Sequence, residues 1–283
     1  MQKRGWKLMA EGVFGGVATQ WRVYGAGNVQ AMALHCSLAH QGAWAGLAQG
    51  LPGVTLTAPD LLGHGRSADW DGRGDFHGLA TRQAMGLLRV MPDGPVHLSG
   101  HSFGATVALR MALEDMDRIA SLTLFEPVLF CAARAAGGPA FADHLAAHAP
   151  FARALEAGDL DAAAESFQAI WGRGERFCDL PEGQRRYIVD RIGLIAAQNA
   201  TLLEDAAGIL AYGRLESLGV PTLLVQGGES PAVIDVINAE LARRLPQARR
   251  ATVGGAGHML PITHAADCAA LVSEFLETAS LRV

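Results

Sequence analysis

The sequence predicts an α/β protein whose mostly parallel, doubly wound sheet of about eight strands is interrupted by one helical insertion. Short apolar runs alternate with helical patterns up to residue 127 and again from residue 220. Such alternation is typical of parallel sheets that are covered on both faces. Half of the 283 residues are hydrophobic and 18% are charged, which favours a large buried core over a disordered chain.

The first part of the chain supplies most of the expected sheet. Residues 13–24 alternate loosely between apolar and polar side chains, which predicts an antiparallel edge hairpin. Apolar runs predict further strands, and longer amphipathic stretches predict helices between them. The expected strands are 29–35, 54–58, 96–99 and 122–125, and the expected helices are 76–90 and 103–115.

The pattern changes after Pro127, because residues 128–215 contain no convincing strand and are rich in alanine. Leu160, Ala164, Phe167 and Trp171 recur at helical spacing, and the segment 157–159 resembles a helix end followed by a new N-cap. The stretch is too long for a single strand-to-strand connection. We therefore expect a helical cap, residues 128–215, over the carboxyl edge of the sheet.

The remaining residues complete the sheet. Strands are expected at 220–225 and 250–253, with helices at 232–245 and 265–278. Residues 1–127 and 216–283 would then form one core domain that is interrupted by the cap.

Composition excludes several classes of function. A net charge of −5 without clustered Lys or Arg argues against a nucleic-acid or anionic-membrane partner, and no apolar run is long enough to span a membrane. No apolar segment follows Lys3-Arg4, so a secretory signal is not expected. The four cysteines form no C-x-x-C pair, and Gly25-Ala26-Gly27 lacks the third glycine of a dinucleotide-binding turn. We expect a cytoplasmic protein with a small-molecule substrate and no metal or cofactor; its oligomeric state cannot be predicted.

The segment Gly100-His101-Ser102-Phe103-Gly104 lies between an expected strand and an expected helix. A G-x-S-x-G sequence in this context predicts a nucleophile elbow, in which a strained turn raises the serine hydroxyl above the sheet. Glycines are needed because the turn leaves no room for a Cβ beside the serine. Serine also needs a general base, and His258 in a glycine-rich loop after the last strand is the best-placed candidate.

Four segments together resemble the α/β-hydrolase superfamily, in particular its esterase-like members with a helical cap. They are Leu34-His35-Cys36-Ser37 with Trp44, the segment 59–67, the elbow 100–104, and the loop 255–261. The resemblance implies a metal-free serine hydrolase and covers nearly the whole chain. It does not identify a substrate.

The resemblance implies that the backbone amides of Ser37 and Phe103 form the oxyanion hole. Cys36 stands where relatives have glycine, which puts the local backbone in question because cysteine disfavours positive φ. A second interpretation makes Cys36 itself a thiol nucleophile. His35 and His64 are interpreted as structural residues.

The sequence offers several candidates for the acid that orients His258, because Ser230 occupies the position where most relatives carry an aspartate. Some relatives carry this acid at the end of the strand after the nucleophile helix, where this chain has Glu126 before Pro127. A charged residue that closes an apolar run is costly unless it is paired, so Glu126 is the preferred acid. Other acids that stay open are Glu229, Asp205 and Asp235.

The expected reaction is acyl transfer from a small carboxylic ester, thioester or lactone, with hydrolysis of a carbon–carbon bond as a variant that uses the same triad. The alternative is a ligand-binding or receptor-like homologue with little or no turnover, suggested by the missing aspartate at position 230. Side chains expected to line the substrate pocket are Leu38, Phe130, Trp171 and Met259.

Overall fold

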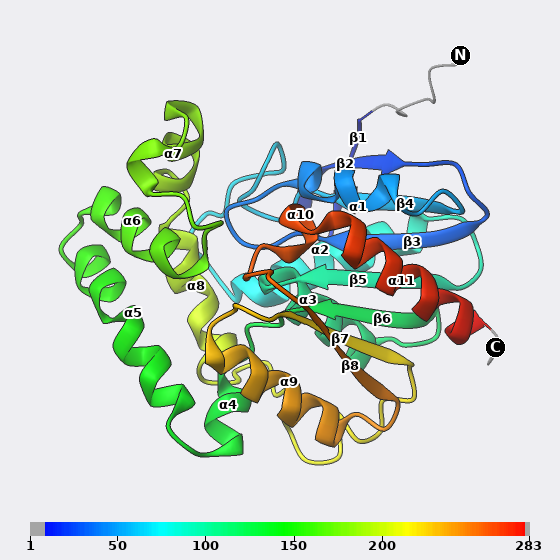
Figure 1. Cartoon of the computed structure of the whole chain (residues 1–283). Helices are drawn as coiled ribbons and strands as arrows, with labels where there is room; N and C mark the ends of the chain where they lie inside the picture. The colour runs from blue at the N-terminus through cyan, green and yellow to red at the C-terminus, as the bar shows by residue number, and fades with distance from the viewer. Residues whose placement is uncertain (1–8, 281–283) are drawn as a thin grey trace.

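Eight strands form one sheet in the computed structural model, which describes residues 9–280 (Figure 1). The strands are β1 (Ala10–Phe14), β2 (Val17–Tyr24), β3 (Val29–Leu34), β4 (Val54–Pro59), β5 (Val96–His101), β6 (Ile119–Phe125), β7 (Thr222–Gly227) and β8 (Ala248–Val253). Their order is β1-β2-β4-β3-β5-β6-β7-β8. Only the β1–β2 and β2–β4 pairs are antiparallel. This confirms the predicted fold class, a mostly parallel sheet with an antiparallel edge hairpin.

Helices cover both faces of the sheet. Those of the core are η1 (Gln41–Trp44), α1 (Ala45–Gln49), α2 (Phe76–Val90), α3 (Phe103–Glu114), α4 (Phe130–Ala136), α9 (Ala232–Arg244), α10 (Leu260–Thr263) and α11 (Ala265–Ser280). Helices α2, α3, α4 and α9 bury their apolar side chains in one cluster, and α1 and α11 in another. Alternate side chains of strand β3 point to opposite faces of the sheet and so enter different clusters. Met32 and Leu34 belong to the first cluster, and Ala31 and Ala33 to the second.

A helical insertion separates β6 from β7. After α4 it contains α5 (Ala140–Glu156), α6 (Leu160–Trp171), η2 (Phe177–Asp179), α7 (Glu182–Val189) and α8 (Gly193–Leu202). No strand occurs in residues 128–215, all of which are described, as the sequence predicts. The Asp159 carboxylate accepts a hydrogen bond from Ala162 N at 3.0 Å, so it is the N-cap of α6.

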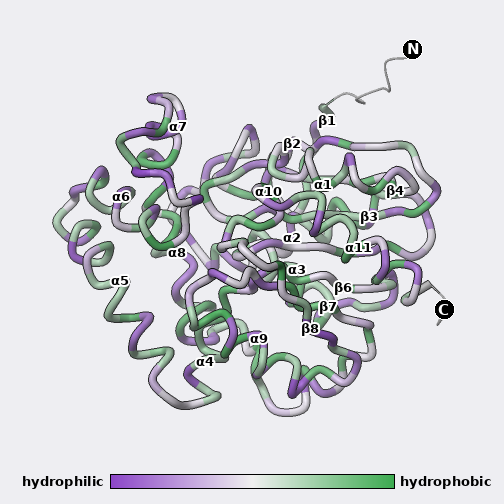
Figure 2. The backbone as a smooth tube through the Cα atoms, in the orientation of Figure 1, coloured by the Kyte–Doolittle hydropathy of each residue, from purple (hydrophilic) through white to green (hydrophobic). Residues whose placement is uncertain are grey.

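Helices α5–α8 stand apart from the sheet layers, at the left of Figure 1. They share a small apolar cluster of their own that includes Phe151, Ile188 and Ile192. Figure 2 shows both hydrophobic and hydrophilic segments along these helices, as expected when one face is packed and the other is solvated.

Within residues 9–280, no helix has the length and apolar character needed to cross a membrane. The N-terminal residues for which the sequence predicts no secretory signal, 1–6, lie outside the described residues.

Candidate active site

Ser102 lies at a sharp bend between β5 and α3, with φ 55° and ψ −118°. A non-glycine residue rarely adopts positive φ, so this conformation stores strain. The two flanking glycines are required by close packing. A Cβ on Gly100 would lie 2.3 Å from Gly104 O, and a Cβ on Gly104 would lie 2.3 Å from Leu34 O. The predicted strand–turn–helix context of the elbow is therefore present.

The sheet register brings Glu126 to the same edge as Ser102. His101 pairs with Phe125 across β5 and β6, and Ser102 N donates a hydrogen bond to Phe125 O at 2.9 Å. Glu126 is the next residue, has φ 48°, and is completely buried. Its position follows from the parallel pairing of two adjacent strands.

The Glu126 carboxylate binds His258. His258 Nδ1 lies 2.6 Å from Glu126 Oε2, and both side chains are almost fully buried. Glu126 Oε1 accepts hydrogen bonds from Gly227 N at 2.7 Å and from the Ser230 hydroxyl. Three donors thus converge on one buried carboxylate, which is the arrangement that an ionised acid requires.

Ser230 has a role that the sequence did not reveal. It stands where the resemblance would place an aspartate, and it donates a hydrogen bond to the Glu126 carboxylate. The other candidate acids are occupied elsewhere or exposed. Asp205 caps the backbone amides of Ile209 and Leu210, Asp235 pairs with Arg250, and Glu229 is exposed.

The contact with Glu126 fixes the tautomer of His258. A carboxylate oxygen only accepts, so Nδ1 carries the hydrogen and Nε2 is left as a base. The His258 carbonyl accepts a hydrogen bond from His101 Nε2 at 2.8 Å, and burial, together with the neighbouring His258, holds the pKa of His101 well below its ordinary value. The Trp171 ring packs edge-on against His258, with ring centroids 4.6 Å apart. The imidazole is therefore held from the core side and from the insertion.

Two cavities meet at Ser102. The larger has a volume of about 530 Å³ and the smaller about 150 Å³. Ser37, Ser102, Phe167 and Trp171 line both cavities, and His258 lines the larger one. Among the described residues no hydrogen bond joins Ser102 to His258; a nucleophile and its base often come within hydrogen-bond distance only when substrate binds.

The structure places each expected pocket residue on one of these cavities. Leu38, Trp171 and Met259 line the larger cavity, and Phe130 lines the smaller one with Trp171. Helix α8 contributes Gln198, and α5 contributes His144 and His148. The sequence analysis missed these three, because an isolated polar residue in an alanine-rich helical stretch does not indicate which way it faces.

The turn after β3 accommodates Cys36 without positive φ. Ala39 N donates to Cys36 O at 3.3 Å, and the positive φ of this turn, 60°, falls at Leu38. The Ser37 hydroxyl donates to Gln198 Oε1 at 2.9 Å. In the described part of the chain, the backbone amides of Ser37 and Phe103 donate to no protein acceptor.

The Cys36 thiol and the His35 ring of this turn are both buried. Burial raises the pKa of the Cys36 thiol to about 12, which argues against a thiolate nucleophile. His35 Nδ1–H donates to Cys36 O at 2.7 Å, while its Nε2 accepts from Leu61 N at 2.9 Å. Burial also lowers the pKa of His35 to about 4, which keeps the ring neutral as these two bonds require. His64 is likewise buried and donates to Leu62 O at 2.8 Å.

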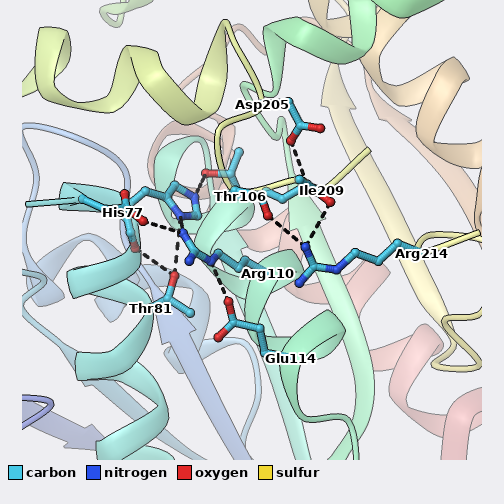
Figure 3. A network of polar contacts seen from close by, with 11 residues as sticks. His77, Thr81, Thr106, Arg110, Glu114, Asp205, Ile209 and Arg214 are labelled. Carbon is cyan, nitrogen blue, oxygen red and sulfur yellow. Dashed lines mark hydrogen bonds and ion pairs between the residues drawn. The ribbon is translucent and has the colours of Figure 1, made fainter. Parts of the chain in front are cut away.

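A polar network anchors the helix that follows the elbow (Figure 3). Arg110 can only donate, so its 3.3 Å contact makes His77 Nδ1 an acceptor and places the ring hydrogen on Nε2. His77 Nε2–H then donates to Thr106 Oγ1 at 3.1 Å, and Thr106 donates to Phe103 O at 2.7 Å. This chain of bonds ties α2 to the first turn of α3.

The family model for the α/β hydrolase fold matches residues 32–265 of the chain, which is well over half of its length. The chain belongs to the α/β-hydrolase family. Within residues 9–280, this α/β hydrolase has no group of three or more His, Cys, Asp or Glu side chains placed to hold a metal ion.

Two curated relatives carry names of hydrolases. The chain is 38% identical to lipase LipV of Mycobacterium tuberculosis over 107 residues, which are 37% of this chain and only 39% of the lipase. It is 27% identical to the 2-hydroxymuconate semialdehyde hydrolase of Pseudomonas sp. strain CF600, over 93% of this chain and 92% of that protein. Family and relatives together support hydrolase activity.

Solved structures agree on the fold. The enol-lactonase of Burkholderia xenovorans LB400 superposes with a TM-score of 0.74 at 22% identity, covering 95% of this chain and all of that one. The 2-hydroxy-6-oxo-6-phenylhexa-2,4-dienoate hydrolase of Rhodococcus sp. strain RHA1 gives 0.70 at 18% identity, over 95% and 99% of the two chains.

Proposed function

We propose that this α/β hydrolase is a serine hydrolase that cleaves a small carboxylic ester, thioester or lactone by acyl transfer. One observation carries the proposal: the buried Glu126 carboxylate holds His258 at 2.6 Å beside the cavity that Ser102 lines from its strained bend. Nucleophile, base and orienting acid come from three different loops at one edge of the sheet, which is the arrangement acyl transfer requires.

In the proposed reaction, the Ser102 hydroxyl attacks the scissile carbonyl while His258 Nε2 takes its proton. Glu126 holds the imidazole in the required tautomer and stabilises its positive form. The amides of Ser37 and Phe103 bind the oxyanion; this role is supported because neither amide has an acceptor among residues 9–280. His258 then returns the proton to the leaving group, and water releases the acyl group by the same steps in reverse.

We assign the acyl group to the smaller cavity and the leaving group to the larger one. A volume of about 150 Å³ matches a short acyl chain, whereas about 530 Å³ accepts a range of leaving groups. Helices α5–α8 supply walls to both cavities and act as the cap in this proposal.

Hydrolysis of a carbon–carbon bond is the second candidate activity. It is favoured by the relative of Pseudomonas sp. strain CF600, a semialdehyde hydrolase that matches nearly the whole chain. A ligand-binding role without turnover is less favoured, because its motive was a missing acid at position 230 and the contact between Glu126 and His258 supports Glu126 as that acid.

A fluorophosphonate probe tests the proposal. We expect rapid stoichiometric labelling of Ser102 in the wild-type protein, and loss of labelling in Ser102→Ala and His258→Ala. p-Nitrophenyl esters of rising chain length then measure the acyl preference, with a dienoate ketone substrate as the test for carbon–carbon cleavage. A folded wild-type protein that neither reacts with the probe nor turns over any of these substrates would support the ligand-binding alternative.

A further inference from the structure

The smaller cavity has walls without charge. Its apolar surface includes Val128, Phe130, Phe151 and Leu202, and none of its lining residues is Asp, Glu, Lys or Arg. A carboxylate held there would lose its hydration without gaining a counter-charge, which is unfavourable. The cavity therefore fits an uncharged acyl group.

A hydrogen-bond donor nevertheless lies in this apolar wall. Gln198 on α8 is 2% exposed, and its Oε1 accepts the hydrogen bond from Ser37. Its Nε2 is buried and has no hydrogen-bond partner within residues 9–280. A buried polar atom without a partner costs free energy, so it calls for a partner that arrives with the ligand. Because Gln198 is bonded to Ser37, that partner would lie near the scissile carbonyl.

His148 on α5 also lines the smaller cavity, and its ring carries a second hydrogen-bond donor. Trp171 Nε1–H donates to His148 Nε2 at 2.6 Å, and since an indole N–H only donates, the hydrogen of the neutral imidazole must be on Nδ1. Burial lowers the pKa of His148 to about 4, in agreement with a neutral ring. Among the described residues, nothing accepts a hydrogen bond from this Nδ1–H.

We propose that the smaller cavity selects acyl groups that carry an uncharged oxygen acceptor close to the scissile carbonyl, such as an ether or ketone oxygen, which Gln198 and His148 bind. This assignment rests on the proposed acyl transfer at Ser102 and deepens it. A plain alkanoyl group fills the same space but leaves both donors without a partner, so it should react more slowly.

A matched pair of esters tests the selection. p-Nitrophenyl methoxyacetate and p-nitrophenyl butanoate differ by one oxygen in place of one methylene. After each kcat/KM is divided by the ester's rate of alkaline hydrolysis, we expect wild type to prefer the methoxyacetate by roughly tenfold or more. Gln198→Met should reduce the preference to about threefold or less, while Gln49→Met, the same change on the exposed surface of α1, should leave it intact.

His148→Phe provides a second variant that keeps an aromatic ring in place and should also reduce the preference. Equal corrected rates for the two esters in wild type, or a preference that survives both substitutions, would overturn the inference while leaving the proposed function in place.

Measuring the affinity of substrate analogues tests this inference independently of the proposed function. In Ser102→Ala we expect the 4-nitroanilide of methoxyacetic acid to bind more tightly than that of butanoic acid, and the difference to disappear when Gln198→Met is added. If this preference is found but no ester shows turnover that depends on Ser102, the acyl-transfer proposal fails. The inference that Gln198 and His148 bind an uncharged oxygen acceptor then still holds.

Discussion

Glu126→Gln is the most informative single change in this protein. Glu126 Oε1 accepts two hydrogen bonds, from Gly227 N and from Ser230, whereas in the described part of the chain Oε2 accepts one, from His258 Nδ1. A glutamine has one acceptor oxygen and one NH₂ group, so its oxygen should take the position that faces two donors. Its NH₂ group would then face His258 and donate to Nδ1.

The expected loss of activity follows because His258 Nδ1 would accept a hydrogen bond in this variant instead of donating one. A His258 ring that accepts at Nδ1 must carry its hydrogen on Nε2, and in that tautomer it cannot take the proton of Ser102. Trapping the wrong tautomer lowers kcat by about 10⁴-fold in such triads, which corresponds to about 5.5 kcal/mol of transition-state stabilisation. Because the side-chain volume is unchanged, the fold should be retained.

The assay compares kcat for a p-nitrophenyl ester in wild type, Glu126→Gln and the control Glu229→Gln, with circular dichroism to verify folding. The control removes an exposed carboxylate nearby and should retain full activity. Adding Ser230→Asp to Glu126→Gln should restore part of the activity, because position 230 already contacts the acid. If Glu126→Gln retains activity within about tenfold of wild type, or if Glu229→Gln is the damaging change, the assignment of the acid is wrong.

Three further predictions concern stability measured by urea unfolding. Gly104→Ala places a Cβ 2.3 Å from Leu34 O and should destabilise the fold by about 1–3 kcal/mol or more; unchanged stability would contradict the packing argument. Thr106→Val leaves the His77 Nε2–H without an acceptor and should cost about 1–3 kcal/mol, whereas no loss would show that the network in Figure 3 carries little energy. Burial lowers the pKa of His35 from 6.5 to about 4, so as the pH falls through this range the unfolded chain binds the proton first, and His35 alone should lower wild-type stability by up to about 3 kcal/mol. His35→Gln should lack this part of the pH dependence, and an identical pH slope in both proteins would refute the role of His35.

Local patterns were enough to predict most of the fold. The helix expected over 76–90 is α2, Phe76–Val90, and the pair of edge strands expected over 13–24 is β1 and β2. The short helices η1 and α1 were not predicted, because segments of four and five residues are too short to show a clear periodicity. In the structure α1 contacts α10 and α11, and η1 contacts α10.

Glu126 could be proposed as the acid from sequence because some relatives carry an acid at the end of this strand, and because a carboxylate that closes an apolar strand needs a partner. The backbone conformation of Glu126 and of the turn after β3 could not be predicted. Glu126 adopts positive φ, and the turn after β3 places its positive φ at Leu38 rather than at Cys36. Neither residue type indicates such a conformation, so both depend on the surrounding structure.

Contacts between the insertion and the core were beyond sequence reasoning. Ser37 and Gln198 are separated by 161 positions and meet only because α8 packs over the edge of the sheet. Helical periodicity shows that a helix has an apolar face, but it does not show which core residue that face covers. The sequence therefore predicted four residues that line the two cavities, but not the polar contact between Ser37 and Gln198.

Rapid-quench mass spectrometry of the protein mixed with p-nitrophenyl butanoate tests the central claim most directly. The account predicts that one butanoyl group appears on the protein in step with the burst of p-nitrophenol, that peptide mapping locates it on Ser102, and that it is absent from Ser102→Ala. An acyl group located on any other residue, or turnover that persists at the wild-type rate in Ser102→Ala, would contradict the account.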